Sequence, residues 1–200
     1  MRVEPLILEL PDGRARLEPL TPEHAASLFK VYGEDPDFFR YYTIAAPDTP
    51  AKMSAWVGAA LDQQASGLAL PFAVFDKSIG EFCGSTRYMD IQPANRMLEI
   101  GSTFYRPRSR RTSVNTECKY LLLRHAFEVL GCVRVQLKCD ARNEPSRAAI
   151  LRIGASFEGI IRQHLARHDG TFRDSAMFSI IESEWPGVKE RLERMLSRSG

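Results

Sequence analysis

The order strand, basic loop, helix, strand across residues 97–139 constrains the fold more than any other feature of this 200-residue chain. Met97 to Tyr105 and Val133 to Cys139 have the composition and spacing of strands, and a helical pattern from about Asn115 to Leu130 lies between them. Two strands that are joined through a helix run parallel in one sheet. We therefore expect at least one parallel strand pair.

The segments on either side of this unit are expected to pair as antiparallel hairpins. The first would contain Leu6 to Leu10 and Arg14 to Leu17 around a Pro-Asp-Gly turn, and the last would contain Ser156 to His164 and Phe172 to Ile181. Further strands are expected at Phe72 to Phe75 and Glu81 to Asp90, and further helices after Thr21-Pro22, after Pro50, over Asn143 to Ile153 and after Trp185-Pro186. Hairpins joined to a crossover predict an α/β fold with a mixed sheet.

Composition favours a single soluble domain. The apolar share of 44% is enough for one core, and no repeat, low-complexity tract or linker divides residues 1–200. The apolar runs are too short to span a bilayer and the N-terminus lacks the pattern of a secretion signal, so we expect a cytoplasmic protein. The cysteines lack zinc-type spacing, so we expect reduced packing residues and no metal site: Cys83, Cys118, Cys132 and Cys139.

The loop between the first strand and the helix of the crossover is strongly basic, although the net charge of the chain is only +2. Arg106, Arg108, Arg110 and Arg111 place four arginines in six residues. A helix start leaves up to four backbone N–H groups unpaired and carries about half a positive charge, so it suits a phosphate, and guanidinium groups add charged donors. From the residues alone, a bound pyrophosphate competes equally with a solvated basic loop or an anchor for RNA phosphates.

Two segments of this region resemble a known superfamily. Leu98-Glu99-Ile100-Gly101 through Tyr105-Arg106-Pro107, followed by Arg110 to Glu117, resembles the acetyl-CoA site of the GNAT acetyltransferases. Asp140 to Ile150, ending at Gly154-Ala155, is similar to that superfamily's next helix. Both segments are most similar to its ribosomal-protein N-terminal acetyltransferase branch. The resemblance implies a mostly antiparallel, V-splayed central sheet that is flanked by helices, and a homodimer is compatible with it.

The resemblance also implies roles for single residues. Backbone groups of Thr103, Phe104 and Tyr105 would bind the pantetheine amides of acetyl-CoA as an added strand does. Asn143 and Ser146 would lie beside the pantetheine and the thioester. The pyrophosphate would be bound by Arg110, Arg111, Thr112, Ser113, Val114 and Asn115. Simpler roles stand beside these: Asn143 suits the N-cap of its own helix, and Thr103 and Phe104 suit packing of the sheet.

The phosphate loop departs from the pattern of the superfamily at two places. In an alignment from Arg108, the positions of glycine and of glycine or alanine hold Arg111 and Ser113. Glycine allows the closest backbone approach and a positive φ. Arg111 fits this loop if its backbone stays helical or extended and its side chain points outward or onto a phosphate, and Ser113 is a mild change.

Glu99 is the candidate general base. It lies in an otherwise apolar strand, where an unpaired charge would be costly, and it matches the position at which enzymes of the superfamily keep a water-linked glutamate. The alternative is a glutamate that faces solvent or pairs with an arginine such as Arg87. Relatives place a tyrosine seven residues after Asn143, but here that residue is Ile150, which donates no proton. Ser146 is therefore the candidate acid, with water or an unassisted thiolate as alternatives.

We expect an N-acetyltransferase that moves the acetyl group of acetyl-CoA to a primary amine, first of all a protein or peptide N-terminal α-amine. A small amine (a polyamine, an amino acid or an amino sugar) is one alternative, and a non-catalytic CoA- or RNA-binding module is another. Nucleic acid is expected as a partner only through a ribosomal target, and no membrane is expected. A cationic acceptor stays open because residues 34–50 contain Glu34, Asp35, Asp37 and Asp48.

Overall fold

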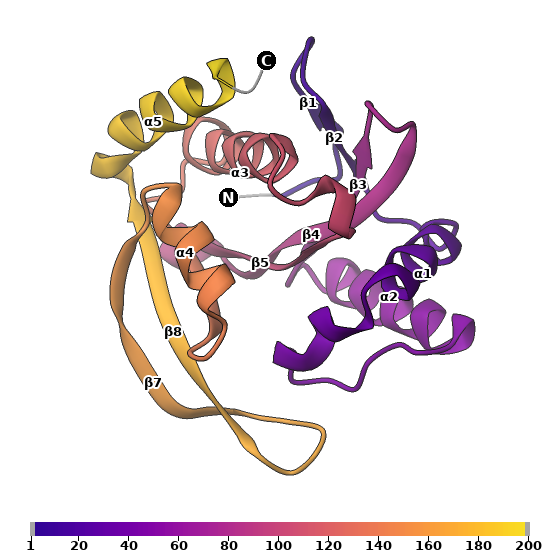
Figure 1. Ribbon diagram of the computed structural model, residues 1–200. Helices are drawn as coiled ribbons and strands as arrows, with labels where there is room; N and C mark the ends of the chain where they lie inside the picture. Colours follow the sequence, from indigo (N-terminus) through magenta and orange to yellow (C-terminus); the bar gives the residue numbers. More distant parts are fainter. Residues whose placement is uncertain (1–2, 199–200) are drawn as a thin grey trace.

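Eight strands form one sheet in the order β1-β2-β3-β4-β5-β6-β8-β7 in the computed structural model, which describes residues 3–198 (Figure 1). The strands are β1 (Leu8–Glu9), β2 (Ala15–Pro19), β3 (Leu70–Asp76), β4 (Glu81–Gln92), β5 (Met97–Tyr105), β6 (Arg134–Asp140), β7 (Ser156–Ala166) and β8 (Phe172–Ile181). Only β5 and β6 are paired in parallel, and every other neighbouring pair is antiparallel. The mixed, mostly antiparallel sheet expected from the sequence is confirmed.

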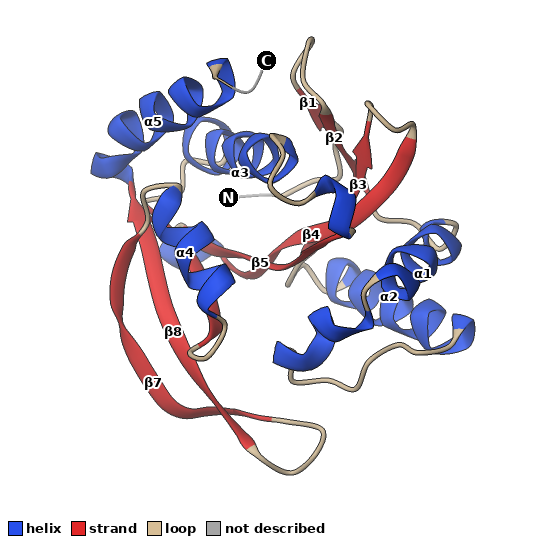
Figure 2. Ribbon diagram, viewed as in Figure 1, coloured by secondary structure: helices blue, strands red, loops and turns tan. Residues whose placement is uncertain are grey.

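Helices cover both faces of the sheet (Figure 2). One face packs against α1 (His24–Glu34) and α2 (Pro50–Ala65), with a core that includes Leu28, Met53, Trp56 and Phe104. The opposite face packs against α3 (Val114–Arg124) and α5 (Trp185–Ser197), and α4 (Glu144–Arg152) joins that larger core through buried Ile150. Each helix therefore buries one apolar stripe against the sheet.

The helix starts follow local sequence signals. Thr49 caps α2, because its side-chain hydroxyl accepts a hydrogen bond from the Lys52 N–H at 3.2 Å. Asn143 caps α4 in the same way, accepting from the Ser146 N–H at 3.1 Å. The helix expected over residues 115–130 consists of α3 and one π-helical segment, His125–Val129. Among the described residues, no helix is long and apolar enough to cross a membrane.

The sheet splits between β5 and β6. Their register contains three residue pairs, from Met97 opposite Arg134 to Glu99 opposite Gln136. Beyond Glu99 the two strands separate, so the edge of β5 that faces β6 has no main-chain partner over residues 100–105 of the described chain. This geometry is the V-shaped opening that the sequence resemblance implied.

A β-bulge in β5 bends the strand along this opening. The pairing with β4 shifts between Ser85 and Arg87, and Ser102 takes a left-handed backbone conformation with φ of 49°. On β4, a Cβ at Gly84 would lie 2.0 Å from the Phe104 carbonyl oxygen, so only glycine fits opposite the bulge. The bulge therefore sets the direction in which the second half of β5 diverges from β6.

Candidate active site

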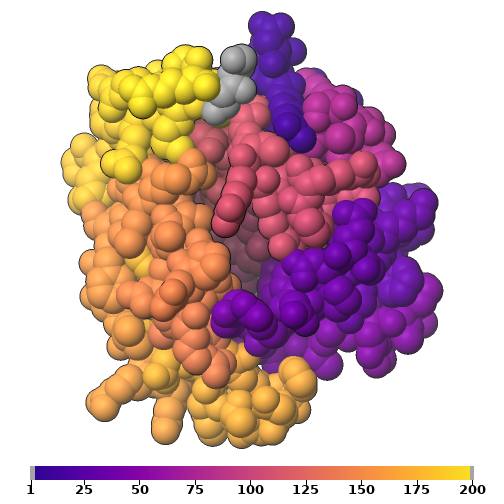
Figure 3. Space-filling model, viewed as in Figure 1, coloured from indigo at the N-terminus to yellow at the C-terminus, as the bar shows by residue number. Residues whose placement is uncertain are grey.

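A cavity of about 2040 Å³ occupies the opening between β5 and β6. In Figure 3 the surface is hollowed between the orange residues around α4 and the purple residues that follow α1. Its walls include residues 99–105 of β5, 137–140 of β6 and 110–113 of the arginine-rich loop. Trp56 of α2 and the segment 37–44 close the other side. The cavity thus extends from the loop before α3 to the segment that follows α1.

All of the sequence-predicted site residues lie around this opening. Twelve residues were expected to bind the donor or carry the chemistry, and the walls of the cavity include eleven of them: Glu99, Thr103, Phe104, Tyr105, Arg110, Arg111, Thr112, Ser113, Asn115, Asn143 and Ser146. Val114 does not line the cavity, and its side chain is fully buried in the larger core. Its contribution to a donor site would have to come from its backbone.

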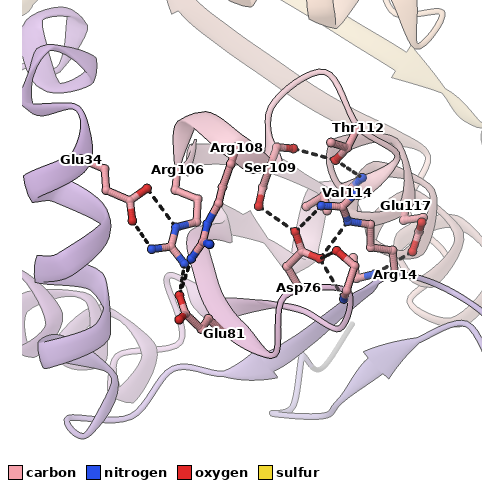
Figure 4. Close-up of polar contacts among 12 residues, drawn as sticks. Arg14, Glu34, Asp76, Glu81, Arg106, Arg108, Ser109, Thr112, Val114 and Glu117 are labelled. Atoms are coloured by element: carbon pink, nitrogen blue, oxygen red, sulfur yellow. Dashed lines mark hydrogen bonds and ion pairs between the residues drawn. The ribbon is translucent and has the colours of Figure 1, made fainter.

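Asp76 attaches the arginine-rich loop to the sheet (Figure 4). Its buried carboxylate accepts hydrogen bonds from Arg14 Nε and Nη2, both at 2.8 Å, and from Ser109 Oγ at 2.7 Å. Burial alone would raise the pKa of Asp76, but the hydrogen bonds from Arg14, Ser109 and Ser78 outweigh it and lower that pKa to about 2. The loop is therefore held by an ionised, fully satisfied carboxylate.

Two of the four arginines in the loop point away from the helix start. Arg106 is buried and pairs with Glu34 at the end of α1 and with Glu81 at the start of β4, and Arg108 donates to Glu81 at 2.6 Å (Figure 4). Arg106 and Arg108 are therefore not available to a phosphate at the helix start, and of the four only Arg110 and Arg111, the two arginines expected to bind the pyrophosphate, line the cavity. Glu34 and Glu81 neutralise the first two arginines. Both carboxylates lie far from the loop in the sequence, so the sequence alone does not reveal the pairs.

Arg110 and Arg111 differ from each other. Arg110 Nε donates to the Tyr105 carbonyl oxygen at 2.7 Å, and its Nη1 pairs with Asp35. Arg111 makes no side-chain hydrogen bond or ion pair within residues 3–198 and lines the cavity. Its φ is 57°, so its backbone is neither right-handed helical nor extended, and the condition for an unstrained arginine in this loop is not met. The turn has a left-handed conformation that favours glycine, and a non-glycine residue adopts it at some cost in strain.

The start of α3 presents unpaired backbone donors. The Val114 N–H donates to Thr112 Oγ1 at 3.3 Å, and the Glu117 N–H donates to the Ser113 carbonyl at 2.8 Å. Within the described chain, the N–H groups of residues 111, 112, 113, 115 and 116 have no acceptor. Donors at a helix start that also carries a positive dipole form an anion site.

Glu117 fixes the other side of this helix start. Its carboxylate is buried and accepts from the Ala15 N–H at 2.8 Å. A Cβ at Gly13 would lie 2.8 Å from Glu117 Oε2 and 2.9 Å from Leu10 Cβ, so the turn before β2 requires glycine. The first hairpin and α3 are therefore in direct contact, and the position of the helix start is set by the sheet.

Glu99 lies at the apex of the opening and is only 2% exposed. Its Oε2 accepts from Lys138 Nζ at 2.7 Å and from Gln136 Nε2 at 3.2 Å, and the ion pair with Lys138 joins the two arms of the V. The charge partner is therefore Lys138 and not Arg87. Oε1 has no donor among the described residues and lies over Gly101, where a Cβ would be 2.9 Å away. The absence of a side chain at Gly101 leaves this oxygen open.

Lys119 is a site residue that the sequence reasoning missed. It lies in α3, is buried and lines the cavity, where its Nζ donates to Thr103 Oγ1 at 3.0 Å. Burial lowers the pKa of Lys119 to about 8, and the nearby Glu99 charge opposes this shift only in part. A signal was present: Lys119, Leu122, Leu123 and Ala126 have the i, i+3, i+4, i+7 spacing of one buried face.

The α4 side of the cavity is mostly apolar. Ile150 is buried where relatives place a tyrosine, and Ser146 interacts with the Cys139 thiol. Burial raises the pKa of Cys139, and the contact with Ser146 opposes the shift. Asn143 is used as a helix cap, which supports the simpler role named for it. Its side-chain carbonyl oxygen already accepts from the Ser146 N–H, and its amide N–H₂ is free to donate to a ligand.

One side of the cavity, called the acceptor side below, is enclosed by residues 37–44 after α1 and by the hairpin of β7 and β8. The short helix Pro36–Tyr41 packs its aromatic rings on β5, with Phe38 stacked on Phe104 at 4.6 Å between ring centres. Arg167, near the tip of the last hairpin, pairs with Asp140 and donates to the Tyr42 carbonyl at 3.1 Å. The chain therefore bridges the opening on this side, and the aromatic residues Phe38, Tyr41 and Tyr42 lie in the wall of the cavity.

A sheet that opens at one parallel pair, an unpaired strand edge leading to an anion site and a carboxylate at the apex together define an acyltransferase. The chain belongs to the GNAT acetyltransferase family, because the model of the acetyltransferase (GNAT) domain matches residues 14–156. This finding confirms the resemblance seen in the sequence, and with it the enzyme class.

Similar proteins agree with this assignment. The crystal structure of a GCN5-related N-acetyltransferase from Brucella melitensis is 37% identical with a TM-score of 0.88, over 97% of this chain and 86% of that one. A protein of Bacillus subtilis named "Putative ribosomal N-acetyltransferase YdaF" is 32% identical over 110 residues, which are 55% of this chain and 59% of that relative. The match thus covers less than two thirds of its length. Mycobacterium smegmatis RimJ, solved in complex with CoA-disulfide, is 22% identical with a TM-score of 0.80 over 96% of this chain and 93% of that one, which shows a shared fold.

Proposed function

We propose that this N-acetyltransferase uses acetyl-CoA to acetylate the α-amine at the N-terminus of a peptide or protein. The observation that carries the proposal is the open strand edge of β5, which runs from the Glu99 carboxylate to the unpaired N–H groups before α3. One end of this edge suits proton transfer and the other suits a diphosphate, so a long donor with an acyl group at its tip fits both.

The residues present fit the donor. The N–H groups of residues 111–113, 115 and 116 and the unpaired Arg111 side chain would bind the pyrophosphate, together with Arg110. Backbone groups of Thr103 to Tyr105 on the free edge would pair with the pantetheine amides. Asn143 and Ser146 face the same cavity from α4. When bound, acetyl-CoA supplies an activated acyl thioester; the protein supplies orientation and proton transfer.

Glu99 would accept the proton that the amine loses as its nitrogen bonds to the acetyl carbon and the bond to sulfur breaks. Oε1 is open toward the cavity, while the ion pair of Oε2 with Lys138 fixes the position of the carboxylate. An α-amine with a pKa of about 8 costs about 1.4 kcal/mol to deprotonate at pH 7, whereas a lysine amine costs roughly 4.6 kcal/mol. A single ion-paired carboxylate is better suited to deprotonating an α-amine, which has the lower free-energy cost, than a lysine amine. Ser146 is the candidate donor to the departing thiolate.

Three of the four carboxylates that residues 34–50 contribute already have partners within the described chain, which argues against a polyamine. Glu34 is paired with Arg106, Asp35 with Arg110 and Asp48 with Lys52. A polycation would have to displace these internal partners. The ribosomal name of the Bacillus subtilis relative supports a protein N-terminus instead.

The test is thiol release from acetyl-CoA with a panel of peptides and small amines, repeated with Glu99→Gln. We expect turnover with peptide α-amines, and a fall in kcat of roughly 100-fold or more in the variant, with the CoA affinity measured by calorimetry unchanged. Glu158→Gln is the matched control, since Glu158 is an ion-paired glutamate of β7 outside the cavity. Equal kcat values for Glu99→Gln and the parent at all pH values would remove Glu99 from the mechanism.

A further inference from the structure

Two arginines on the acceptor side of the cavity have no carboxylate partner within residues 3–198. Arg87 of β4 is 7% exposed, its Nε has no hydrogen-bond acceptor, and its Nη1 is 3.5 Å from Gln63 Oε1. Arg173 of β8 donates from Nε to Ser175 Oγ at 3.1 Å and makes no ion pair. Both side chains line the cavity. Burying a guanidinium without an anion is costly, so an anion that the chain itself does not provide fits here.

Arg87 lies on the same face of the sheet as the Glu99 carboxylate. Its Cα is opposite Gly101, and a Cβ at Gly101 would lie 2.9 Å from Glu99 Oε1 and 2.7 Å from Met89 Sδ. Arg87 and Met89 are two residues apart on one strand, so their side chains share that face. The Arg87 guanidinium lies 4.9 Å from the centre of the Trp56 ring, which places it on the α2 side.

Arg173 converges on the same region. Its side chain lines the same cavity as Arg87, Tyr42 and Glu99. Burial raises the pKa of Tyr42 to about 12, so this hydroxyl stays neutral and does not neutralise either arginine. Glu99 is itself paired with Lys138. The acceptor side of the apex therefore carries an excess of positive charge.

The phosphates of the donor are not the missing anion for Arg87. The phosphate loop begins after Tyr105, four residues beyond Gly101, which is about 13 Å along an extended strand. Arg87 also faces α2, whereas the unpaired N–H groups belong to the start of α3 on the opposite face. An anion that satisfies Arg87 must enter with the acceptor.

We propose that the acceptor carries a carboxylate close to its reactive amine, and that Arg87 and Arg173 bind this carboxylate. This inference rests on the proposed function. Glu99 and the residue opposite Arg87 are two positions apart on β5, or about 7 Å. That separation matches the distance from an α-amine to the side-chain carboxylate of an acidic residue at the second position of a peptide. A planar guanidinium offers a carboxylate two parallel hydrogen bonds.

The experiment compares acetylation of three peptides that differ only at the second residue: Ser-Glu, Ser-Gln and Ser-Lys, with free glutamate as a fourth acceptor. We expect kcat/KM to be at least ten-fold higher for Ser-Glu than for Ser-Gln, and lowest for Ser-Lys. Arg87→Met keeps the apolar stem over Trp56 and removes the charge. It should lower kcat/KM for Ser-Glu by roughly 30-fold or more, with little change for Ser-Gln.

Arg16→Met is the matched control, because the Arg16 guanidinium also lies over an aromatic ring, 4.6 Å from the centre of Phe75, but outside the cavity. It should keep the preference for Ser-Glu. Arg173→Met provides a second variant if Arg87→Met does not fold, and it should weaken the same preference.

The outcomes separate the two proposals. Equal kcat/KM for Ser-Glu and Ser-Gln in the parent enzyme, or a preference that survives in both arginine variants, overturns the carboxylate site and leaves peptide acetylation standing. Thiol release with glutamate alone supports the carboxylate site and overturns the peptide acceptor. Absence of thiol release with every peptide and amine overturns the proposed function itself.

Discussion

Replacing Asp76 by asparagine should destabilise the protein and weaken donor binding, because this carboxylate connects β3, the first hairpin and the arginine-rich loop. Asp76 is fully buried and accepts hydrogen bonds from Arg14, Ser78 and Ser109. Asparagine keeps the shape of the side chain but loses the charge, and its amide N–H₂ faces donors. Arg14 and the Ser109 hydroxyl would lose an acceptor in a buried place.

The magnitude follows from the pKa of the carboxyl group, which is about 2 in the folded protein and 3.8 in its reference state. At about 1.4 kcal/mol per pH unit, this difference corresponds to about 2.5 kcal/mol of unfolding free energy at neutral pH. A depressed carboxyl pKa stabilises the fold above pH 3.8, and the contribution is lost as the pH falls through 2. The variant should therefore be about 2.5 kcal/mol less stable at pH 7, and the gap should narrow below pH 4.

Urea unfolding of both proteins at pH 7, 5, 4 and 3.5 measures this gap. Asp48→Asn is the control, since Asp48 forms an exposed pair with Lys52 and its loss should change stability by less than about 1 kcal/mol. Calorimetry with CoA should show weaker binding to Asp76→Asn, because Ser109 no longer holds the loop. A variant as stable as the parent at pH 7, or a gap that is the same at pH 3.5, would refute the reasoning.

Two further predictions concern residues that the cavity places in unusual states. Arg111→Gly should raise the unfolding free energy by up to about 1 kcal/mol, since glycine adopts φ of 57° without strain, and it should lower CoA affinity because the charge is removed. Urea unfolding measures the first effect and calorimetry the second, and a variant less stable than the parent would contradict the backbone strain. Between pH 8 and 10.5 the unfolded chain holds the Lys119 proton more tightly than the fold, so stability should rise with pH by up to about 3 kcal/mol. Lys119→Met should lack this rise, and identical pH profiles of the two proteins would contradict it.

Much of the fold was readable from local patterns. The period-2 alternation of Val133 to Cys139 and the helical stripe before it were enough to place the parallel pair, because those patterns reflect burial on known faces. The hairpins followed from turn residues in the same way. The V-shaped opening came from the family resemblance and not from periodicity, since no local pattern reports where two strands stop pairing.

The site was less predictable, because its contacts join residues far apart in the chain. Glu99 was identified from an isolated charge in an apolar strand, but its partner Lys138 lies 39 positions later. Four arginines crowd the basic loop in the sequence, but Glu34 and Glu81 pair with two of them, Arg106 and Arg108. Spacing along the chain says nothing about such pairings. The left-handed backbone of Arg111 was also hidden, because only the identity of the residue, and not its conformation, is written in the sequence.

The three-pair seam between β5 and β6 also matters for how the two parts of the protein hold together. The β5–β6 pairing that joins residues before and after this seam is short, so cohesion also relies on the Glu99–Lys138 ion pair, on the contact of Arg167 with Tyr42, and on the packing of α5 against α3. There the Tyr120 hydroxyl donates to Glu193 at 2.9 Å and Trp185 stacks on Phe127 at 5.4 Å between ring centres. A donor lying along the seam would add a bridge between the same two parts. Binding of the donor along β5 would therefore also strengthen the contact between the two parts of the protein on either side of the β5–β6 pairing.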